Sequence, residues 1–332
     1  MKYQALILVI AILFSTLMLH ALVAEERSVL STPPLPESIT RLGTYTVPSL
    51  AQKNKFQTAS FRELPVDVPL QEPSPQGETS VVEKPSVGSI ASSCSLSVAA
   101  YLVKDITHGK IIVSKNETGS RPIASVSKLM TTLVAMESMQ SEAVITVSEN
   151  AHALAEGYAS LEVGASYTVQ DLIRAALVVS SNDATYALAE SFGFDTFVTR
   201  MNEKAKEIGM RQTIFTEPSG LSYLNQSTVS DLALLLAYIY QTQPTLLAIT
   251  REKIVPIMNQ TRQRTIRLLN VNYFAGTKNF IGGKTGFINE SGGNLVALFH
   301  ENSSVWAVEV LGSDDRFADL SRLLLCAQKM KQ

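Results

Sequence analysis

The chain has 332 residues, which is enough for one large domain or two domains of ordinary size. Its formal net charge of -2 shows no basic surplus of the kind that nucleic-acid-binding proteins carry, so nucleic acid is not an expected partner. Hydrophobic residues make up 45% of the chain and charged residues 17%, a composition typical of a globular protein with an added apolar segment.

The apolar segment occupies residues 5–24 and is about 20 residues long, enough for a helix to span a bilayer. Lys2 precedes it and acidic residues follow it, so the positive-inside rule places the rest of the chain outside the cytoplasm. We expect residues 1–24 to anchor a single-pass protein of the cell membrane whose folded part is extracytoplasmic. A cleaved signal peptide, which would give a secreted or periplasmic protein, is the alternative, although Leu22 makes a poor cleavage site.

Residues 25–93 are rich in Pro, Ser and Glu and have little periodic apolar pattern. Such a composition cannot bury a core, so an extended extracytoplasmic linker is predicted. The folded domain is predicted to cover residues 94–332, and the two cysteines, Cys94 and Cys326, bracket it. A disulfide between them would persist outside the cytoplasm, while a small buried hydrophobe is the alternative for Cys326.

The folded domain is predicted to begin with a β-hairpin. Residues 95–105 and 110–116 have the apolar pattern of two strands, and the turn "ITHG" separates them. Two more strands are predicted near the other end of the chain, at residues 294–301 and 304–312.

Helices are predicted between these two pairs of strands, and signals mark their ends. Thr168, and either Ser227 or Thr228, can cap the first turn of a helix, and Gly193 and Gly209 can end one. The predicted helices cover 122–136, 167–179, 183–193, 195–209, 227–242 and, after the last strand, 316–332. This order indicates an α+β fold in which one sheet is built from both ends of the domain and a helical part is inserted.

The predicted helix at 122–136 carries a lysine in otherwise apolar surroundings. Lys128 follows Ser125 by three positions, and residues three apart lie on the same face of a helix, so Ser127 should point elsewhere. A serine is a weak nucleophile that needs a base, and burial lowers the pKa of a lysine so that it can act as one. A helix-start serine beside a snorkelling lysine is the alternative for this motif alone.

The triplet Lys284-Thr285-Gly286 is predicted at the end of a strand that runs into a glycine-bounded turn. Gly286 allows the backbone to approach a ligand closely, and Thr285 supplies a hydroxyl suited to a carboxylate. Lys284 supplies a second cation, which would lower the pKa of Lys128 further. An ordinary hairpin turn is the alternative for the triplet by itself.

A third pattern, Ser-x-Asn, occurs three times. The matches are Ser114-Lys115-Asn116, Ser148-Glu149-Asn150 and Ser180-Ser181-Asn182. We choose the third, because it lies in a short break between two apolar helices, where a loop can be held rigidly inside a cleft. Ser180 could then relay a proton and Asn182 could hold a substrate amide, while Ser181 should point away.

In this order, the three motifs resemble the set shared by β-lactamases and penicillin-binding proteins. Residues 96–324 resemble the low-molecular-weight penicillin-binding proteins, the D-alanyl-D-alanine carboxypeptidases and endopeptidases of serine peptidase family S11. The stretches that carry the resemblance are "RPIASVSKLMT", "YTVQDLIRAALVVSSNDATYALAE", "EPSGLSYLNQSTVSDLALLLAY" and "FIGGKTGFINESGGNLVA". "SSND" and "EPSGL" look closest to the endopeptidase-like members. The implied fold is the penicillin-binding protein/β-lactamase-like one, an antiparallel sheet flanked by helices with an inserted helical subdomain.

The implied function is that of a D-Ala-D-Ala carboxypeptidase, which acts on peptidoglycan stem peptides through a serine acyl-enzyme. A D,D-endopeptidase that cuts peptidoglycan crosslinks is the alternative. Ser125 would attack the penultimate carbonyl with Lys128 as its base, and the backbone N–H groups of Ser125 and Phe287 would hold the oxyanion. Ser180 and Lys284 would pass the proton to the leaving amine.

The terminal carboxylate of the substrate would be bound by Thr285 and Lys284. β-Lactams would acylate the nucleophile because they mimic the substrate, and the resemblance implies no metal and no cofactor. Ile288 departs from the threonine that is frequent at this position. The second β-rich domain and C-terminal anchor found in many members are not expected here.

Other functions have weaker support from the sequence. A class A β-lactamase uses an additional glutamate for deacylation, and no Glu-x-x-Leu-Asn stretch occurs between Asn182 and Lys284. A non-catalytic β-lactam sensor would need a receiver inside the cell, and few residues precede the apolar segment. A Ser-His-Asp triad is possible in composition only.

Overall fold

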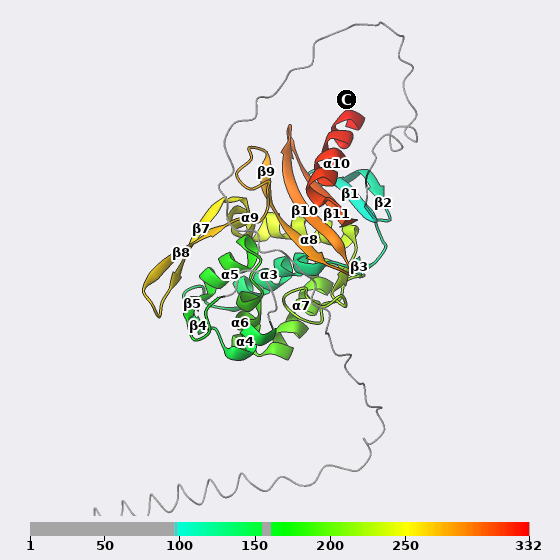
Figure 1. Ribbon diagram of the computed structural model, residues 1–332. Coiled ribbons are helices and arrows are strands. Elements are labelled where there is room, and N and C mark those ends of the chain that lie inside the picture. Colours follow the sequence, from blue (N-terminus) through cyan, green and yellow to red (C-terminus); the bar gives the residue numbers. More distant parts are fainter. Residues whose placement is uncertain (1–95, 97, 155–160, 332) are drawn as a thin grey trace, which may run out of the picture. The chain divides into compact units, whose positions relative to one another are not determined.

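Figure 1 shows the computed structural model of the protein as a ribbon. The described residues are 96, 98–154 and 161–331. The predicted anchor at 1–24 and the predicted linker at 25–93 therefore lie outside the described residues.

The last helix of the domain is α10 (Arg316–Lys331), and it carries Cys326. This cysteine is disulfide-bonded, which decides between the two alternatives that the sequence left open for it. The other cysteine of the chain is Cys94, which lies outside the described residues.

A five-stranded antiparallel sheet forms the centre of the domain. From one edge to the other its strands are β2 (Lys110–Lys115), β1 (Ala100–Asp105), β11 (Ser304–Ser313), β10 (Gly292–Glu301) and β9 (Phe280–Ile288). β1 pairs with β11, so strands from the two ends of the domain lie side by side (Figure 1). The predicted hairpin of β1 and β2 and the predicted sheet built from both ends are confirmed.

The chain between β2 and β9 is mostly helical, as predicted. Its helices are α3 (Lys128–Ser138), α4 (Glu149–Leu154), α5 (Val169–Val178), α6 (Asn182–Phe192), α7 (Phe194–Ile208), α8 (Val229–Thr242) and α9 (Pro244–Arg251). Figure 1 shows α3 to α7 gathered beyond one end of the sheet. Within the described ranges, no single helix has the length and apolar character needed to cross a membrane, and α8 and α9 pass that test only as a pair bent by 102°.

Three short antiparallel pairs join the helices. They are β3 (Arg121–Pro122) with β6 (Gln226–Ser227), β4 (Val144–Thr146) with β5 (Ser166–Thr168), and β7 (Ile254–Asn259) with β8 (Arg264–Leu269). Helix ends agree with the sequence signals. Thr168 caps α5 by accepting a hydrogen bond from the backbone of Asp171 at 3.1 Å, and Thr228, rather than Ser227, caps α8. Gly209 ends α7 in the left-handed conformation.

Helices cover both faces of the central sheet. Trp306 and Val308 of β11 belong to the core beneath α10, which includes Leu320. Leu311, also on β11, belongs to the core on the other face together with Leu232 of α8. Because successive side chains of a strand point to opposite faces, a strand buried on both faces reads as the continuous apolar run seen in "SVWAVEV".

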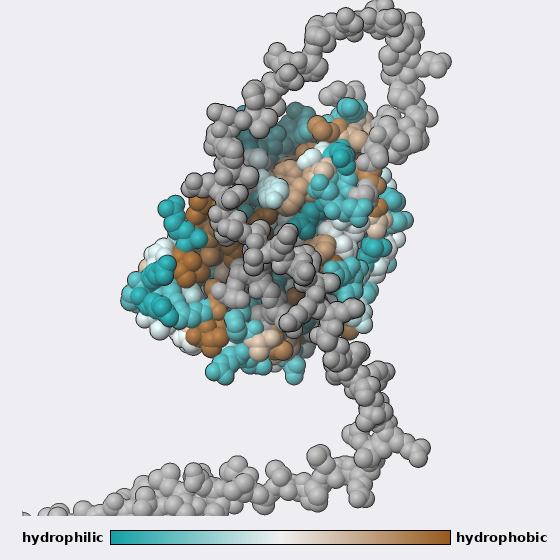
Figure 2. Space-filling view, in the orientation of Figure 1, coloured by the Kyte–Doolittle hydropathy of each residue, from teal (hydrophilic) through white to brown (hydrophobic). Residues whose placement is uncertain are grey.

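The sequence did not predict α9 or the hairpin of β7 and β8. Pro256 interrupts β7, and a proline lowers the expectation of a strand because it cannot donate to the ladder. Both strands of a two-stranded hairpin are edge strands, where a proline is tolerated. Pro256 is exposed and lies opposite Arg267. Figure 2 shows a hydrophilic tip and a more hydrophobic base on this hairpin, where the exposed Ile254 and Leu269 form a pair.

Candidate active site

Ser125 and Lys128 lie at the junction between a turn of 3-10 helix, η1 (Ala124–Ser127), and α3. The sequence predicted one continuous helix here, whereas the structure places Ser125 in the 3-10 turn. Residues three apart eclipse in a 3-10 helix, so the two side chains still meet, and Lys128 Nζ lies 3.0 Å from Ser125 Oγ. Ser127 points elsewhere, as predicted, and donates to the carbonyl of Ala124 at 2.9 Å.

Lys128 is fully buried, and its nitrogen has further polar neighbours. Nζ lies 2.7 Å from Asn182 Oδ1 and 2.6 Å from the carbonyl oxygen of Ser219. Burial lowers the pKa of Lys128 from 10.5 to about 7, and the carboxylate of Glu217 opposes this shift. The sequence attributed part of the lowering to Lys284, but burial is the cause of it in the structure.

Ser180 lies in the break between α5 and α6, and Asn182 follows that break. Ser180 has a φ of 59°, an uncommon conformation for a residue with a side chain, and its Oγ accepts a hydrogen bond from Lys284 Nζ at 3.0 Å. Asn182 is the first residue of α6 and reaches Lys128. Ser181 caps α6 with its hydroxyl and so points away from both lysines. Ser180 thus contacts Lys284, and Asn182, two residues later, contacts Lys128.

The other two Ser-x-Asn matches have different neighbours. Ser148, just before α4, donates to Glu190 at 2.6 Å. Asn116, just after β2, donates to the carbonyl of Ala99 at 2.8 Å. Among the residues that the structure describes, the third match is the one that brings its serine and its asparagine to the two lysines.

Lys284, Thr285 and Gly286 lie inside β9 and pair with β10, so the prediction that they close the strand at a turn is wrong. Lys284 is fully buried, and its Nζ also donates to the carbonyl of Thr285 at 2.8 Å. Burial, followed by the nearby cations Lys128 and Arg316, lowers the pKa of Lys284 well below 10.5. Two buried lysines therefore share one site, and a charge on Lys128 disfavours a charge on Lys284.

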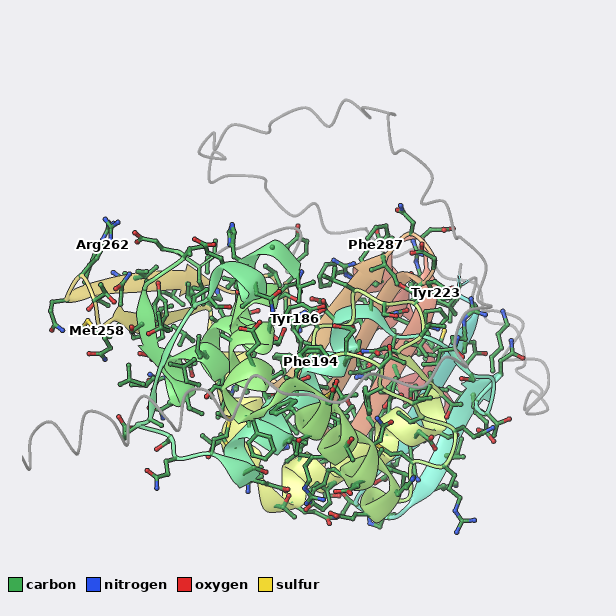
Figure 3. The ribbon with its side chains drawn as sticks, turned by 90° about the horizontal axis from the view of Figure 1, so that it is seen from below. Tyr186, Phe194, Tyr223, Met258, Arg262 and Phe287 are labelled. Atoms are coloured by element: carbon green, nitrogen blue, oxygen red, sulfur yellow. The ribbon has the colours of Figure 1, made fainter. Side chains whose placement is uncertain are left out.

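Gly286 lets β9 run close past the nucleophile. A Cβ atom at this position would lie 2.8 Å from the carbonyl oxygen of Ile123 and 3.0 Å from the backbone nitrogen of Ser125. A side chain would therefore push β9 away from η1. Phe287, the next residue, is 59% exposed, and Figure 3 shows it toward the same edge of the molecule as the exposed Tyr223.

The predicted site residues surround one cavity of about 320 Å³. Lys128 and Lys284 are fully buried next to residues of its wall, whereas the hydroxyls of Ser125 and Ser180 belong to the wall itself. The residues that line the cavity are Ser125, Val179, Ser180, Asn182, Leu221, Val271, Thr285, Gly286, Phe287, Ile288 and Arg316. The arrangement can hold a peptide end against a hydroxyl whose base lies next to it in the protein interior.

One part of the site that the sequence did not predict is the turn at 217–225. Glu217 is buried and accepts hydrogen bonds from the backbone of this turn, and the carbonyl of Ser219 accepts from Lys128. Gly220 has a φ of 84°, and a Cβ atom on it would lie 1.9 Å from the carbonyl oxygen of Ala124. The available signal was the glutamate in "EPSGLS", which stands before a turn of small residues.

Arg316 is a second residue of the site that sequence reasoning missed. It is the first residue of α10, it lines the cavity, and its Nη1 donates to the carbonyl of Gly286 at 3.3 Å. Its Nε is buried and has no hydrogen-bond partner within the described part of the chain. Burial lowers the pKa of Arg316, but a guanidinium titrates so high that it stays charged. The site therefore contains a permanent cation whose Nε–H group is available to donate a hydrogen bond.

One histidine does lie between a serine and an aspartate, yet it forms no triad. His108 Nδ1 lies 3.0 Å from Asp105 Oδ2 and 3.4 Å from Ser304 Oγ. Both contacts use the same ring nitrogen, whereas a triad needs one nitrogen for each partner. The cavity around Ser125 is the better candidate for nucleophilic chemistry.

Replacing Gly220 by alanine should destabilise the fold, because the new Cβ atom would overlap the backbone beside the nucleophile. Gly109 is the matched control, since it has a similar positive φ of 71° and a Cβ atom on it would meet nothing within 4 Å. We expect Gly109→Ala to cost about 1 kcal/mol of unfolding free energy and Gly220→Ala at least twice as much. Urea denaturation of both variants measures the difference, and equal losses would contradict the close contact.

Comparison with known proteins gives consistent results. A sequence model of peptidase family S11, described as D-alanyl-D-alanine carboxypeptidase, matches residues 87–315. The D-alanyl-D-alanine endopeptidase of Escherichia coli (strain K12) is 32% identical over 252 residues, which are 73% of this chain and 81% of that protein. The D-alanyl-D-alanine endopeptidase of Pseudomonas aeruginosa is 34% identical over 250 residues, 69% of this chain and 76% of that protein.

A solved structure resembles the fold as well. Penicillin-binding protein D2 from Listeria monocytogenes, in its ampicillin-bound form, has a TM-score of 0.60 and 27% sequence identity, covering 70% of this chain and 98% of that chain. The predicted penicillin-binding-protein fold is thereby confirmed. The span matched by the family model includes all eight residues that the sequence singled out for the site.

Proposed function

Because the chain belongs to serine peptidase family S11, the D-alanyl-D-alanine carboxypeptidases, we propose that it is a serine-type D-Ala-D-Ala carboxypeptidase that acts on peptidoglycan stem peptides. The observation that carries the proposal is the 3.0 Å contact between the Ser125 hydroxyl, at the cavity wall, and the buried nitrogen of Lys128. The contact pairs a nucleophile with a base, the arrangement that acyl transfer through a serine requires.

Lys128 acts as the base in its neutral form. A neutral amine keeps two N–H groups and one lone pair. The side-chain oxygen of Asn182 and the backbone carbonyl oxygen of Ser219 each accept a hydrogen bond from one of these N–H groups. The lone pair is left for the proton of Ser125. As Ser125 Oγ bonds to the carbonyl carbon of the penultimate D-Ala, its proton passes to Lys128 Nζ.

The oxyanion formed in this step is bound by the backbone N–H groups of Ser125 and Phe287. Support for this role is the close passage of Gly286 in β9 past the backbone nitrogen of Ser125. Collapse of the tetrahedral intermediate breaks the C–N bond, and the departing amine takes the proton of the Ser180 hydroxyl, which Lys284 replaces. The proton that Lys128 took from Ser125 makes up the one that Lys284 gives, so one proton in all passes from Ser125 to the amine. Water then cleaves the acyl-enzyme. Preorganised donors such as the backbone N–H groups of Ser125 and Phe287 supply a large part of the rate enhancement in acyl transfer.

The terminal carboxylate of the substrate binds between Thr285 and Arg316. Both line the cavity, Arg316 has an unused buried donor in the described structure, and Lys284 lies beside Thr285. A guanidinium is well suited to a carboxylate, since its fork of N–H donors matches the two oxygens. Asn182 lies in the same wall and is placed to hold the amide of the scissile region.

A D,D-endopeptidase that cuts crosslinks between stem peptides is the second candidate. It is favoured by the names of the Escherichia coli and Pseudomonas aeruginosa relatives, which are both endopeptidases. The chemistry at Ser125 is common to both reactions, because each cleaves the bond after a D-Ala carbonyl.

We also propose that residues 1–24 anchor the protein in the cell membrane and that residues 25–93 hold the catalytic domain, 94–332, away from it. The apolar length of the segment at 5–24 and the position of Lys2 support this location. Release of a periplasmic or secreted protein by cleavage is the alternative.

Changing Ser125 to alanine should abolish covalent labelling by a fluorescent penicillin, because β-lactams acylate the nucleophile. Ser127→Ala is the matched control, since Ser127 lies two residues on and donates to Ala124 instead of facing the base. We expect Ser127→Ala to keep labelling within about threefold of the parent protein, and gel fluorescence measures both. Labelling that survives Ser125→Ala and disappears in Ser127→Ala would overturn the assignment.

The rate constant of acylation should rise with pH around a midpoint near the Lys128 pKa of about 7. Only the neutral amine accepts the proton, so below the midpoint the rate should fall about tenfold per pH unit. Stopped-flow measurement with a chromogenic cephalosporin between pH 5 and 9 gives the profile. Lys128→Arg stays protonated and should show no acylation at any of these pH values, and a flat profile for the parent protein would rule out Lys128 as the base.

Digestion of isolated muropeptides decides between the two peptidase reactions. The proposal expects the free pentapeptide to lose its terminal D-Ala and become a tetrapeptide, as measured by mass spectrometry. Crosslinked dimers converted to monomers, with pentapeptides left intact, would instead establish the endopeptidase. Ser125→Ala serves as the control for contaminating peptidases in both digests.

A further inference from the structure

Glu217 is a buried carboxylate that the mechanism above does not use. It organises the turn at 217–225 by accepting hydrogen bonds from several donors at once. The donors are Ser219 N and Ser219 Oγ at 2.6 Å, Gly220 N at 2.5 Å, Asn225 Nδ2 at 3.0 Å, Ser222 N at 3.3 Å and Tyr186 OH at 3.4 Å. These donors hold both carboxyl oxygens in place, so the acidic side chain is fixed in this turn.

The same turn contacts the segment from Ala124 to Lys128 in three places. Ser219 presents its carbonyl oxygen to Lys128 Nζ at 2.6 Å. Gly220 packs against the backbone on the N-terminal side of Ser125. The side-chain nitrogen of Asn225 donates to the backbone carbonyl and to the carboxylate of Glu217 and, at 3.1 Å, to Ser127 Oγ. The carboxylate is thus connected to both the nucleophile turn and the base.

The two buried lysines provide a comparison within one site. Both are fully buried, and burial lowers the pKa of each. Lys284 has two cations for neighbours, Lys128 and Arg316, which lower its pKa further. Lys128 has Glu217, which raises its pKa against the effect of burial. The lysine that needs to accept a proton is the one next to the fixed negative charge.

We propose that Glu217 is a positioning residue for acylation, which holds the turn at 217–225 against the nucleophile and makes Lys128 an effective proton acceptor at neutral pH. The proposal rests on the proposed function, because it assigns Lys128 the role of base. A lysine stripped of its proton by burial alone would be neutral but weakly basic, and a base works best when its pKa lies near the working pH.

Other ionisable groups near this pair have different orientations or roles. Tyr186, on α6 near the centre of Figure 3, donates to Glu217, and burial followed by that carboxylate raises the pKa of Tyr186 to about 12, so it stays neutral. Asp183, also on α6, accepts from Leu161 N and contacts His152. From β9 and α10 the facing groups are the cations Lys284 and Arg316. Glu217 is the acidic group whose charge acts on Lys128.

The test is the pH profile of acylation in Glu217→Gln, measured on the full chain with a chromogenic cephalosporin. Loss of the charge should move the midpoint down by at least about one pH unit and lower the plateau rate about tenfold or more, because the base becomes weaker and the turn loses acceptors. At pH 6 the variant should therefore run within about twofold of its own plateau, whereas the parent protein runs about tenfold below its plateau. A midpoint that stays in place or rises would overturn the proposal.

Asp231→Asn is the matched control. Asp231 is also a buried carboxylate that accepts from a turn, at Gln212 N and Thr213 Oγ1, both at 2.8 Å. A purely structural effect of losing such a carboxylate would lower the stability of both variants without moving the midpoint. We expect Asp231→Asn to melt at a lower temperature and to keep its midpoint near that of the parent protein.

Two further measurements keep the outcome decisive. Glu217→Asp retains the carboxylate, so its midpoint should stay that of the parent protein while its plateau rate falls. A midpoint displaced downward in this variant would count against the proposal. This test remains available if Glu217→Gln does not fold. Direct NMR titration of the Lys128 side-chain nitrogen, assigned by its loss in Lys128→Arg, reads the same midpoint without any reaction. If the parent protein is not acylated but the Lys128 midpoint is still lower in Glu217→Gln than in the parent protein, the proposed function is refuted and the effect of Glu217 on Lys128 is established.

Discussion

Two lysines that share one buried site impose the constraint on which the rest of the structure depends. Lys128 and Lys284 are fully buried, so water cannot stabilise a charge on either nitrogen. The fold instead supplies oxygens from an amide, a hydroxyl and backbone carbonyls, which a lysine nitrogen can contact in its neutral form as well as in its charged form. The break between α5 and α6 provides Ser180 for Lys284, and the first residue of α6, Asn182, contacts Lys128.

This arrangement lowers the stability of the folded protein. The pKa of Lys128 falls from 10.5 to about 7 on folding, so between these values the unfolded chain binds a proton that the folded chain does not. The contribution of Lys128 to stability therefore declines as the pH falls from 10.5 to about 7, by roughly 5 kcal/mol in all, and changes little below that. The apolar cores on both faces of the sheet offset this cost, which the proposed role of Lys128 as a base requires.

The sequence predicted those parts of the site that depend on local spacing or on a short motif. Ser125 and Lys128 are three positions apart, a separation that brings them together in either type of helix. Lys128 and the carbonyl of Ser219 are 91 positions apart, and Gly286 and Arg316 are 30 apart, so only the packing of the complete domain brings these groups together. The strand β7 was not predicted for a related reason. A proline is tolerated in a strand of a two-stranded hairpin but not in a central strand, and only the folded domain shows which of the two Pro256 occupies.

The same cavity suits both peptidase reactions because the group that leaves is similar in each. In a stem peptide the departing D-Ala carries a carboxylate on the carbon next to its nitrogen. In a crosslink the departing amine belongs to the side chain of a neighbouring stem, whose D-configured end can carry a carboxylate in the same place. Under the proposed function, Thr285 and Arg316 bind the carboxylate of either substrate, so this contact does not discriminate between the two. Under that proposal, discrimination between the two substrates depends on residues outside the carboxylate contact, and the exposed Phe287 beside the cavity is one of them.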